Sequence, residues 1–113
     1  PAYNDYVTRS KIPEATAALS TTRVRLEQFF QDNRTYMGFN CVSSTKYFDI
    51  SCSAQAATTY TIQAVGRAGA SMAGFTYTVT EANTQGTTIA APAPTDWQIA
   101  AAACWVTKKG GQC

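Results

Sequence analysis

The feature that most constrains this chain is a long run of helical periodicity near its N-terminal end. Between Asn4 and Asn33, small and apolar side chains recur at steps of three and four residues. This spacing places them on one face of a single helix. The members of that face are Ile12, Ala15, Leu19, Thr22, Leu26 and the pair Phe29 and Phe30.

A proline lies inside this run. Because Pro13 lacks a backbone donor and its ring clashes with the preceding turn, we expect a kink or break near Lys11–Ile12. Residues 3–7 would then form a separate helical arm. Tyr3 and Tyr6 on that arm have no evident sheet to cover, which favours contact with another chain. Farther along, Phe30 and Tyr36 are expected to pack between the helix and a sheet.

After Cys41 the hydrophobic period changes to two, which is typical of strands. The residues that share one face are Tyr60, Ile62 and Ala64 in one strand and Phe75, Tyr77 and Val79 in the next. The predicted strands are Lys46–Cys52, Thr58–Val65, Gly74–Thr80 and a short edge strand Thr87–Ala90.

A chain of 113 residues is too short for two cores of ordinary size. The sequence therefore predicts a single α+β domain over residues 1–113. A helix over residues 1–34 would be followed by a small sheet over residues 41–107 and a C-terminal loop over residues 104–113.

Four cysteines, Cys41, Cys52, Cys104 and Cys113, favour disulfides and hence an oxidising compartment. The chain has no histidine and no CxxC motif, so zinc would require an unusual four-thiolate site. Four cysteines allow three pairings. We favour Cys41–Cys52 with Cys104–Cys113, because each closes a short loop beside strand-like sequence at little entropic cost.

Catalysis is not predicted. There is no histidine for acid–base work, no GxSxG motif around a serine, and no glycine-rich phosphate loop. The carboxylates are scattered along the chain. We therefore expect no enzyme activity, no metal and no cofactor.

The basic residues near the C-terminus leave two interpretations open. Lys108 and Lys109 lie between two cysteines and next to Trp105, so they could contact phosphates while the ring stacks on a base. Alternatively, Trp105 belongs to the core and the lysines keep an exposed loop soluble, which the residues alone favour. Lys46 and Arg67 could join the group only if their turns converge on it. The net charge of +2 is a weak argument for nucleic acid.

Several segments of the chain together form a recognisable set. They are Pro1-Ala2-Tyr3-Asn4-Asp5-Tyr6-Val7-Thr8-Arg9-Ser10-Lys11, Glu14-Ala15, the run from Arg25 to Tyr36, the strand Gly74–Val79 and the terminus Cys104–Cys113. In this order they resemble type IV pilins, in particular proteobacterial minor pilins of the PilE type. The resemblance covers both ends and the middle of the chain, and the terminal cysteine loop is its most specific element.

The resemblance implies a long helix packed on an antiparallel sheet of about four strands, the type IV pilin fold. Cys104 and Cys113 would close the exposed D-region used for subunit contacts or adhesion, and Cys41–Cys52 would staple the segment between helix and sheet. Tyr3, Tyr6 and Ile12 would lie in the filament interface with other pilin subunits. The resemblance also implies an apolar helical segment ahead of Pro1, which is held in the inner membrane before assembly.

The sequence thus indicates a structural subunit of a type IV pilus, extracellular in the filament and with an inner-membrane or periplasmic pool. Its roles would be adhesion, twitching motility or DNA uptake. The alternative is a DNA-binding minor pilin that acts as a receptor in natural transformation, with Lys46, Trp105, Lys108 and Lys109 as contacts. An unrelated secreted disulfide domain is the third interpretation, which the N-terminal run disfavours.

Overall fold

A long helix, α1 (Ala2–Asn33), opens the computed structural model, which describes residues 2–113 of the chain. Its buried face is the one that the periodicity predicts. The helix ends where expected, because Arg34 takes a left-handed backbone conformation (φ 59°) and donates its N–H to the Phe30 carbonyl. Pro1, with which the predicted helix begins, lies outside the described residues.

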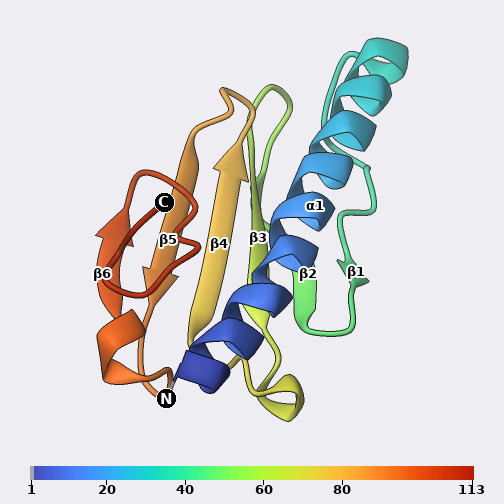
Figure 1. Cartoon of the computed structure of the whole chain (residues 1–113). Coiled ribbons are helices and arrows are strands. Elements are labelled where there is room, and N and C mark those ends of the chain that lie inside the picture. The colour runs from blue at the N-terminus through green and yellow to red at the C-terminus, as the bar shows by residue number, and fades with distance from the viewer. Residues whose placement is uncertain (1) are drawn as a thin grey trace.

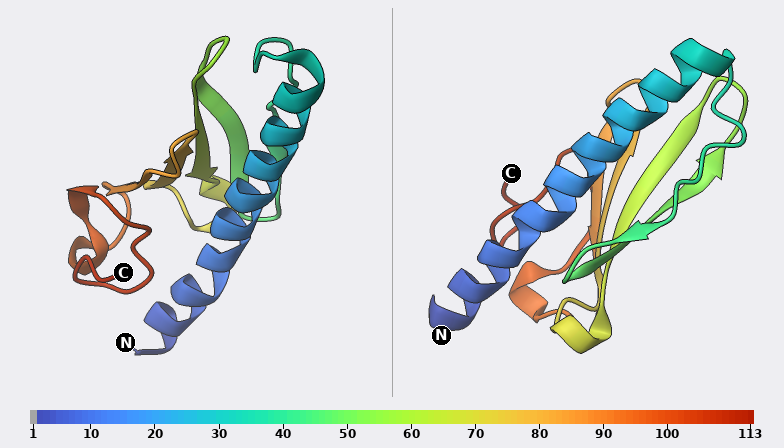
Figure 2. Two further views of the ribbon diagram at one scale, coloured as in Figure 1. Left: turned by 90° about the horizontal axis from the view of Figure 1, so that it is seen from above. Right: turned by 90° about the vertical axis from the view of Figure 1, so that its right-hand side faces the viewer.

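The predicted break at Pro13 and the separate arm over residues 3–7 are wrong. The helix is continuous through Pro13 (Figure 2). A proline removes one backbone hydrogen bond and crowds the preceding turn, but packing can outweigh that cost. Here Ile12 and Ala15, on either side of the proline, are fully buried, so the core fixes the direction of the helix before and after it.

The rest of the chain forms one antiparallel sheet in which each strand pairs with the next along the chain, in the order β1-β2-β3-β4-β5-β6. α1 runs diagonally across one face of this sheet (Figure 1). Two short 3-10 helices, η1 (Ala68–Ala70) and η2 (Thr95–Trp97), lie in the connections. The strands are β1 (Ser43–Ser44), β2 (Phe48–Gln55), β3 (Tyr60–Gly66), β4 (Phe75–Thr80), β5 (Gln85–Ile89) and β6 (Ile99–Ala102).

The sheet has six strands, and the prediction of about four is corrected by two short strands at its edges. β1 and β6 carry no alternating pattern, and serine and alanine are not strand-forming residues. They are strands because they pair, Ser43 opposite Ile50 and Ala102 opposite Thr87. β5 is therefore not the edge strand that the sequence predicts, since β6 covers it.

The core fills the space between α1 and the inner face of the sheet. Tyr60, Ile62 and Ala64 of β3 face α1 and are at most 1% exposed, as their alternation predicts. The inner positions of β4 are equally buried. Trp97 of η2, fully buried, closes the core near the start of α1 and meets the Phe75 ring edge to face, with centroids 5.7 Å apart.

At the opposite end of the core, tyrosines join the helix to the sheet. Glu27 of α1 accepts hydrogen bonds from the hydroxyl groups of Tyr36 at 3.0 Å and Tyr60 at 3.1 Å. The Tyr36 ring also packs on Phe30, with centroids 4.7 Å apart, which confirms the predicted packing of this pair. The Glu27 carboxylate is thus satisfied by two hydroxyl donors from residues of the core.

Both disulfides form with the pairing that the sequence favours. Cys41–Cys52 links the segment after α1 to β2, with Cα atoms 5.7 Å apart. Cys104–Cys113 closes a loop at the end of the chain, with Cα atoms 6.2 Å apart. We call residues 104–113 the C-terminal loop.

Candidate functional site

The C-terminal loop is fixed to the sheet at its base. The Tyr77 hydroxyl of β4 donates to the Val106 carbonyl at 2.7 Å, and Val106 is fully buried. The Thr87 hydroxyl of β5 accepts a hydrogen bond from the Val106 N–H at 3.0 Å. The same hydroxyl donates to the Cys104 carbonyl at 2.6 Å. The loop therefore starts from a buried and fully bonded platform.

Trp105 belongs in part to that platform. Its ring packs against the core, and its indole N–H donates to the Thr78 carbonyl at 2.8 Å. The side chain is half-buried, and the part left open lines a groove beside α1. This arrangement matches the interpretation of Trp105 as a packing residue more closely than that of a free stacking platform.

The two lysines of the loop differ in their surroundings. The Lys109 Nζ lies 2.8 Å from Asp5 Oδ2 and 3.8 Å from Asp96 Oδ2. Lys108 is exposed and has no ion-pair partner within residues 2–113. Of these two lysines, Lys108 is the one whose ammonium group is unpaired within the described residues.

Asp5 is the centre of this ion pair. It accepts from Lys109 with one carboxylate oxygen and from the Trp97 indole N–H, at 3.2 Å, with the other. The bond from Lys109, and then that from Trp97, holds the pKa of Asp5 below its ordinary value. The same contact with Asp5 raises the pKa of Lys109. Both groups are therefore charged across the physiological range.

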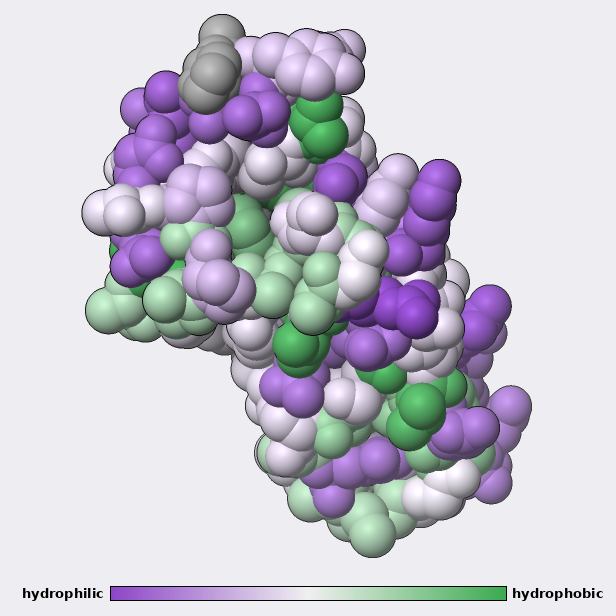
Figure 3. Space-filling model, turned by 90° about the horizontal axis from the view of Figure 1, so that it is seen from below, coloured by the Kyte–Doolittle hydropathy of each residue, from purple (hydrophilic) through white to green (hydrophobic). Residues whose placement is uncertain are grey.

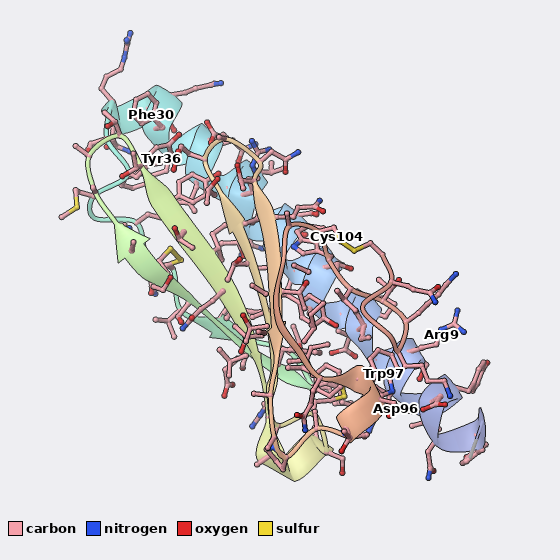
Figure 4. All side chains as sticks on the ribbon, turned by 90° about the vertical axis from the view of Figure 1, so that its left-hand side faces the viewer. Arg9, Phe30, Tyr36, Asp96, Trp97 and Cys104 are labelled. Carbon is pink, nitrogen blue, oxygen red and sulfur yellow. A yellow bond between two sulfur atoms is a disulfide. The ribbon has the colours of Figure 1, made fainter. Side chains whose placement is uncertain are left out.

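A groove of about 420 Å³ separates α1 from the C-terminal loop. Arg9, exposed, lies on its helix side, and Thr107 lies on its loop side. A second hollow, which Pro13, Thr16 and Thr107 also line, continues toward Cys104 and Trp105. In Figure 4 Arg9, Asp96 and Trp97 lie together at one end of the molecule, and Phe30 and Tyr36 lie together at the other.

Lys46 does not join the C-terminal loop. It belongs to the turn before β2, and Figures 1 and 2 show that this segment and the C-terminal loop lie on opposite sides of α1. The Nζ atoms of Lys46 and Lys11 lie 5.5 and 5.3 Å from the Tyr47 ring centroid. Arg67 donates to the Thr45 carbonyl at 3.0 Å in the same region. Lys46, Lys11 and Arg67 therefore form a basic group separate from the loop lysines.

The residues predicted for a filament interface are also placed differently from one another. Tyr3 and Tyr6 are 74% and 68% exposed at the start of α1. Ile12 is 1% exposed and packs inside the chain, so it has no surface to offer a second subunit, and its assignment is corrected. Figure 3, which views the molecule from the end where α1 starts, shows hydrophilic and hydrophobic residues intermixed over this surface.

Sequence reasoning missed Asp5, Arg9 and Thr107 as parts of this site. Asp5 and Trp97 are separated by 92 positions, and no local pattern marks residues that meet only through the fold. Within residues 2–113, no three acidic, cysteine or histidine side chains converge to hold a metal ion. In the same part of the chain, no helix is long and apolar enough to cross a membrane.

A single helix along an antiparallel meander, with a disulfide-closed loop at the C-terminal end, defines the chain as a type IV pilin. Residues 1–105 match the family described as "Type IV minor pilin ComP, DNA uptake sequence receptor", and the chain belongs to this family of minor pilins. The match ends before the tip of the C-terminal loop.

Among solved structures, the non-core minor pilin PilV of Neisseria meningitidis has a similar fold, with a TM-score of 0.71. The two share 15% identity, and the superposition covers 79% of this chain and 94% of that chain. At this identity the likeness concerns the fold. No curated protein matches the chain in sequence.

Proposed function

We propose that this minor pilin binds DNA through the C-terminal loop and the adjoining start of α1. The observation that carries the proposal is the Lys108 side chain, which is exposed on a disulfide-closed loop and has no carboxylate partner within the described residues. A positioned ammonium group can neutralise a phosphate and release its counterion, which is the main source of affinity for DNA.

Arg9 supplies a second cation to this surface. It is exposed, makes no ion pair within residues 2–113, and lines the groove whose other wall includes Thr107, the neighbour of Lys108. Trp105 supports the loop from below, and only the groove-lining part of its ring is left for contact with a sugar or base.

Lys46 belongs to the second basic group, with Lys11 and Arg67. Asp49 lies 3.7 Å from the Arg67 guanidinium, and Glu14 accepts the Lys46 backbone N–H at 3.1 Å, so carboxylates partly offset the charge there. We keep Lys46 as a separate candidate contact, which the same experiment tests.

The experiment is a fluorescence anisotropy titration of a short mixed-sequence duplex at several salt concentrations between about 50 and 200 mM. The variants are Lys108→Gln and Lys46→Gln. Arg25→Gln is the matched control, because Arg25 is an exposed cation on the other half of α1. Log K falls as log salt rises, and the salt slope is taken here as the magnitude of that negative slope. Each lost phosphate contact lowers it by about 0.9.

We expect Lys108→Gln to weaken binding and lower the slope, and Arg25→Gln to change neither. If Lys46→Gln lowers the slope and Lys108→Gln does not, the DNA surface lies on the other side of α1. No binding of the unaltered chain at the lowest salt concentration would overturn the proposal. Selection from a random duplex pool then tests whether binding prefers one sequence, as expected for a receptor of an uptake sequence.

We propose further that Tyr3 and Tyr6 contact other pilin subunits, so that the protein joins an extracellular pilus from an inner-membrane and periplasmic pool. The support is their exposure on the first turns of α1, on a helix whose other face is buried. Sheared pili should contain the native protein and much less of a Tyr3→Ala/Tyr6→Ala variant. Equal amounts of the two in the filament fraction would contradict this role.

A further inference from the structure

The tip of the C-terminal loop is held differently from its base. The base is bonded to β4 and β5 inside the molecule, whereas the tip, residues 108–111, lies on the surface. Gly110 and Gly111 both have positive φ, so the tip backbone adopts a conformation that most residues would resist. Contacts from outside the loop add to its internal hydrogen bonds and its disulfide in fixing where the tip lies.

Two elements supply those contacts. The Gly110 N–H donates to the Asp96 carbonyl of η2 at 2.9 Å. The Lys109 ammonium reaches Asp5 of α1 at 2.8 Å and the Asp96 carboxylate at 3.8 Å. Since Asp5 also accepts from Trp97 of η2, this one carboxylate joins α1, η2 and the loop tip.

This arrangement separates the roles of neighbouring lysines. The Lys109 ammonium is paired with two carboxylates, which offset its charge toward a phosphate. Lys108 is exposed, and its backbone pairs with Gln112 across the loop. The position of its ammonium group therefore depends on where the tip is held.

We propose that Asp5 is a positioning residue for the partner-binding loop. Asp5 binds Lys109 and so holds the loop tip on the first turn of α1, which keeps Lys108 in a fixed place. We call the Asp5–Lys109 ion pair the latch. The role of Lys108 toward DNA rests on the proposed function, whereas the latch itself does not.

The latch and simple electrostatics predict opposite changes in DNA affinity when the Asp5 carboxylate is removed. Removing a negative charge beside a DNA-binding surface should tighten binding if charge alone matters. Removing the latch should weaken binding, because ordering a mobile loop costs conformational entropy. Asp5→Ala therefore separates the two effects. Asp96→Ala is the matched control, since it removes a charge near the same lysine and keeps both the Asp5 contacts and the Asp96 carbonyl.

The first measurement is hydrogen exchange of the Gly110 amide in Asp5→Ala, Asp96→Ala and Asp5→Glu, with core amides of β3 and β4 as the control for global folding. An exposed ion pair contributes little stability, so we expect about threefold faster exchange in Asp5→Ala. We expect near-native exchange in Asp96→Ala and partial recovery in Asp5→Glu. Unchanged Gly110 exchange in Asp5→Ala would overturn the latch.

The second measurement is the anisotropy titration with the mixed-sequence duplex. We expect Asp5→Ala to bind about threefold more weakly at an unchanged salt slope, and Lys109→Gln to keep the native slope as well. Tighter binding by Asp5→Ala would show that Asp5 acts through charge alone and would overturn its positioning role. If the native chain binds no DNA while the exchange result holds, the proposed function fails and the latch stands.

Discussion

The two disulfide-closed segments are similar in size but differ in what surrounds them. Residues 41–52 contain β1 and most of β2, with Phe48 and Ile50 in the core. The C-terminal loop contributes one buried side chain, Val106, and two exposed lysines. The same cross-link therefore joins parts of the sheet in one segment and limits the motion of a surface loop in the other.

This difference shows that a disulfide does not by itself define a role. In residues 41–52 the sheet would hold the chain in place even without the cross-link. In the C-terminal loop the backbone pairs with itself at Lys108 and Gln112 and makes one backbone bond to η2, from Gly110 to Asp96. The side chains of Tyr77, Thr87 and Asp5 provide the rest of the attachment. The C-terminal loop is thus kept in position while its tip stays on the surface.

The largest expected contrast concerns side-chain truncation in each segment. Phe48→Ala should lower the free energy of unfolding by about 4 kcal/mol, because it leaves a cavity in the core. Lys108→Ala should change it by less than about 0.5 kcal/mol, because the side chain is exposed. Urea unfolding of both variants tests the contrast. A similar loss in the two would mean that the loop tip is part of the cooperative core.

The next largest expected difference is between the losses of stability that follow removal of each disulfide. In the unfolded chain the two loops are of similar length, so the entropic term is about 3 kcal/mol for each. Cys41→Ser/Cys52→Ser should lose most of that amount, because the sheet keeps the native segment ordered. Cys104→Ser/Cys113→Ser should lose about half, because the freed native loop regains entropy. Thermal unfolding under non-reducing conditions measures both, and equal losses would contradict the contrast.

A smaller effect is expected at the base of the loop. Tyr77→Phe removes the hydroxyl that donates to the buried Val106 carbonyl and should cost about 1.5 kcal/mol. The loss should be accompanied by faster amide exchange within the C-terminal loop and not within residues 41–52. Tyr47→Phe is a suitable control, because no hydrogen bond to its hydroxyl is present within residues 2–113.

The smallest effect is a response to acid. Since the pKa of Asp5 is lowered in the folded chain, its contacts contribute stability above about pH 4 and lose it as pH falls through the lowered pKa. The NMR signal of the Trp97 indole N–H, which Asp5 accepts, should shift over that range. The indole N–H of Trp105 donates to a backbone carbonyl and should not respond directly. Parallel shifts of both signals would indicate general acid unfolding.

Much of the fold could be predicted because its main elements are periodic. The face of α1 through Leu19 and Leu26, and the inner faces of β3 and β4, follow from spacing alone. β1 and β6 could not be foreseen, since Ser43–Ser44 and the alanines of β6 become strands only through their partners. The break predicted at Pro13 failed because a local propensity was outweighed by burial on both sides.

The candidate site was predictable only in part. The cysteine spacing and the charges marked the C-terminal loop and its lysines. The difference between Lys108 and Lys109 depends on Asp5, which lies at the other end of the sequence, and nothing in its local sequence indicates a contact with the C-terminal loop. The separation of Lys46 from the loop depends on which side of α1 each segment occupies, and sequence spacing does not encode this.

The unbroken course of α1 has a mechanical consequence. At 1.5 Å per residue its 32 residues span about 48 Å, close to the 49 Å longest dimension of the molecule. A force applied at one end of α1 is therefore transmitted along the whole molecule by a single helix, with the sheet packed along its side. The C-terminal loop is attached to α1 at Asp5, within the first turns, so a load on the loop passes directly to the start of the helix.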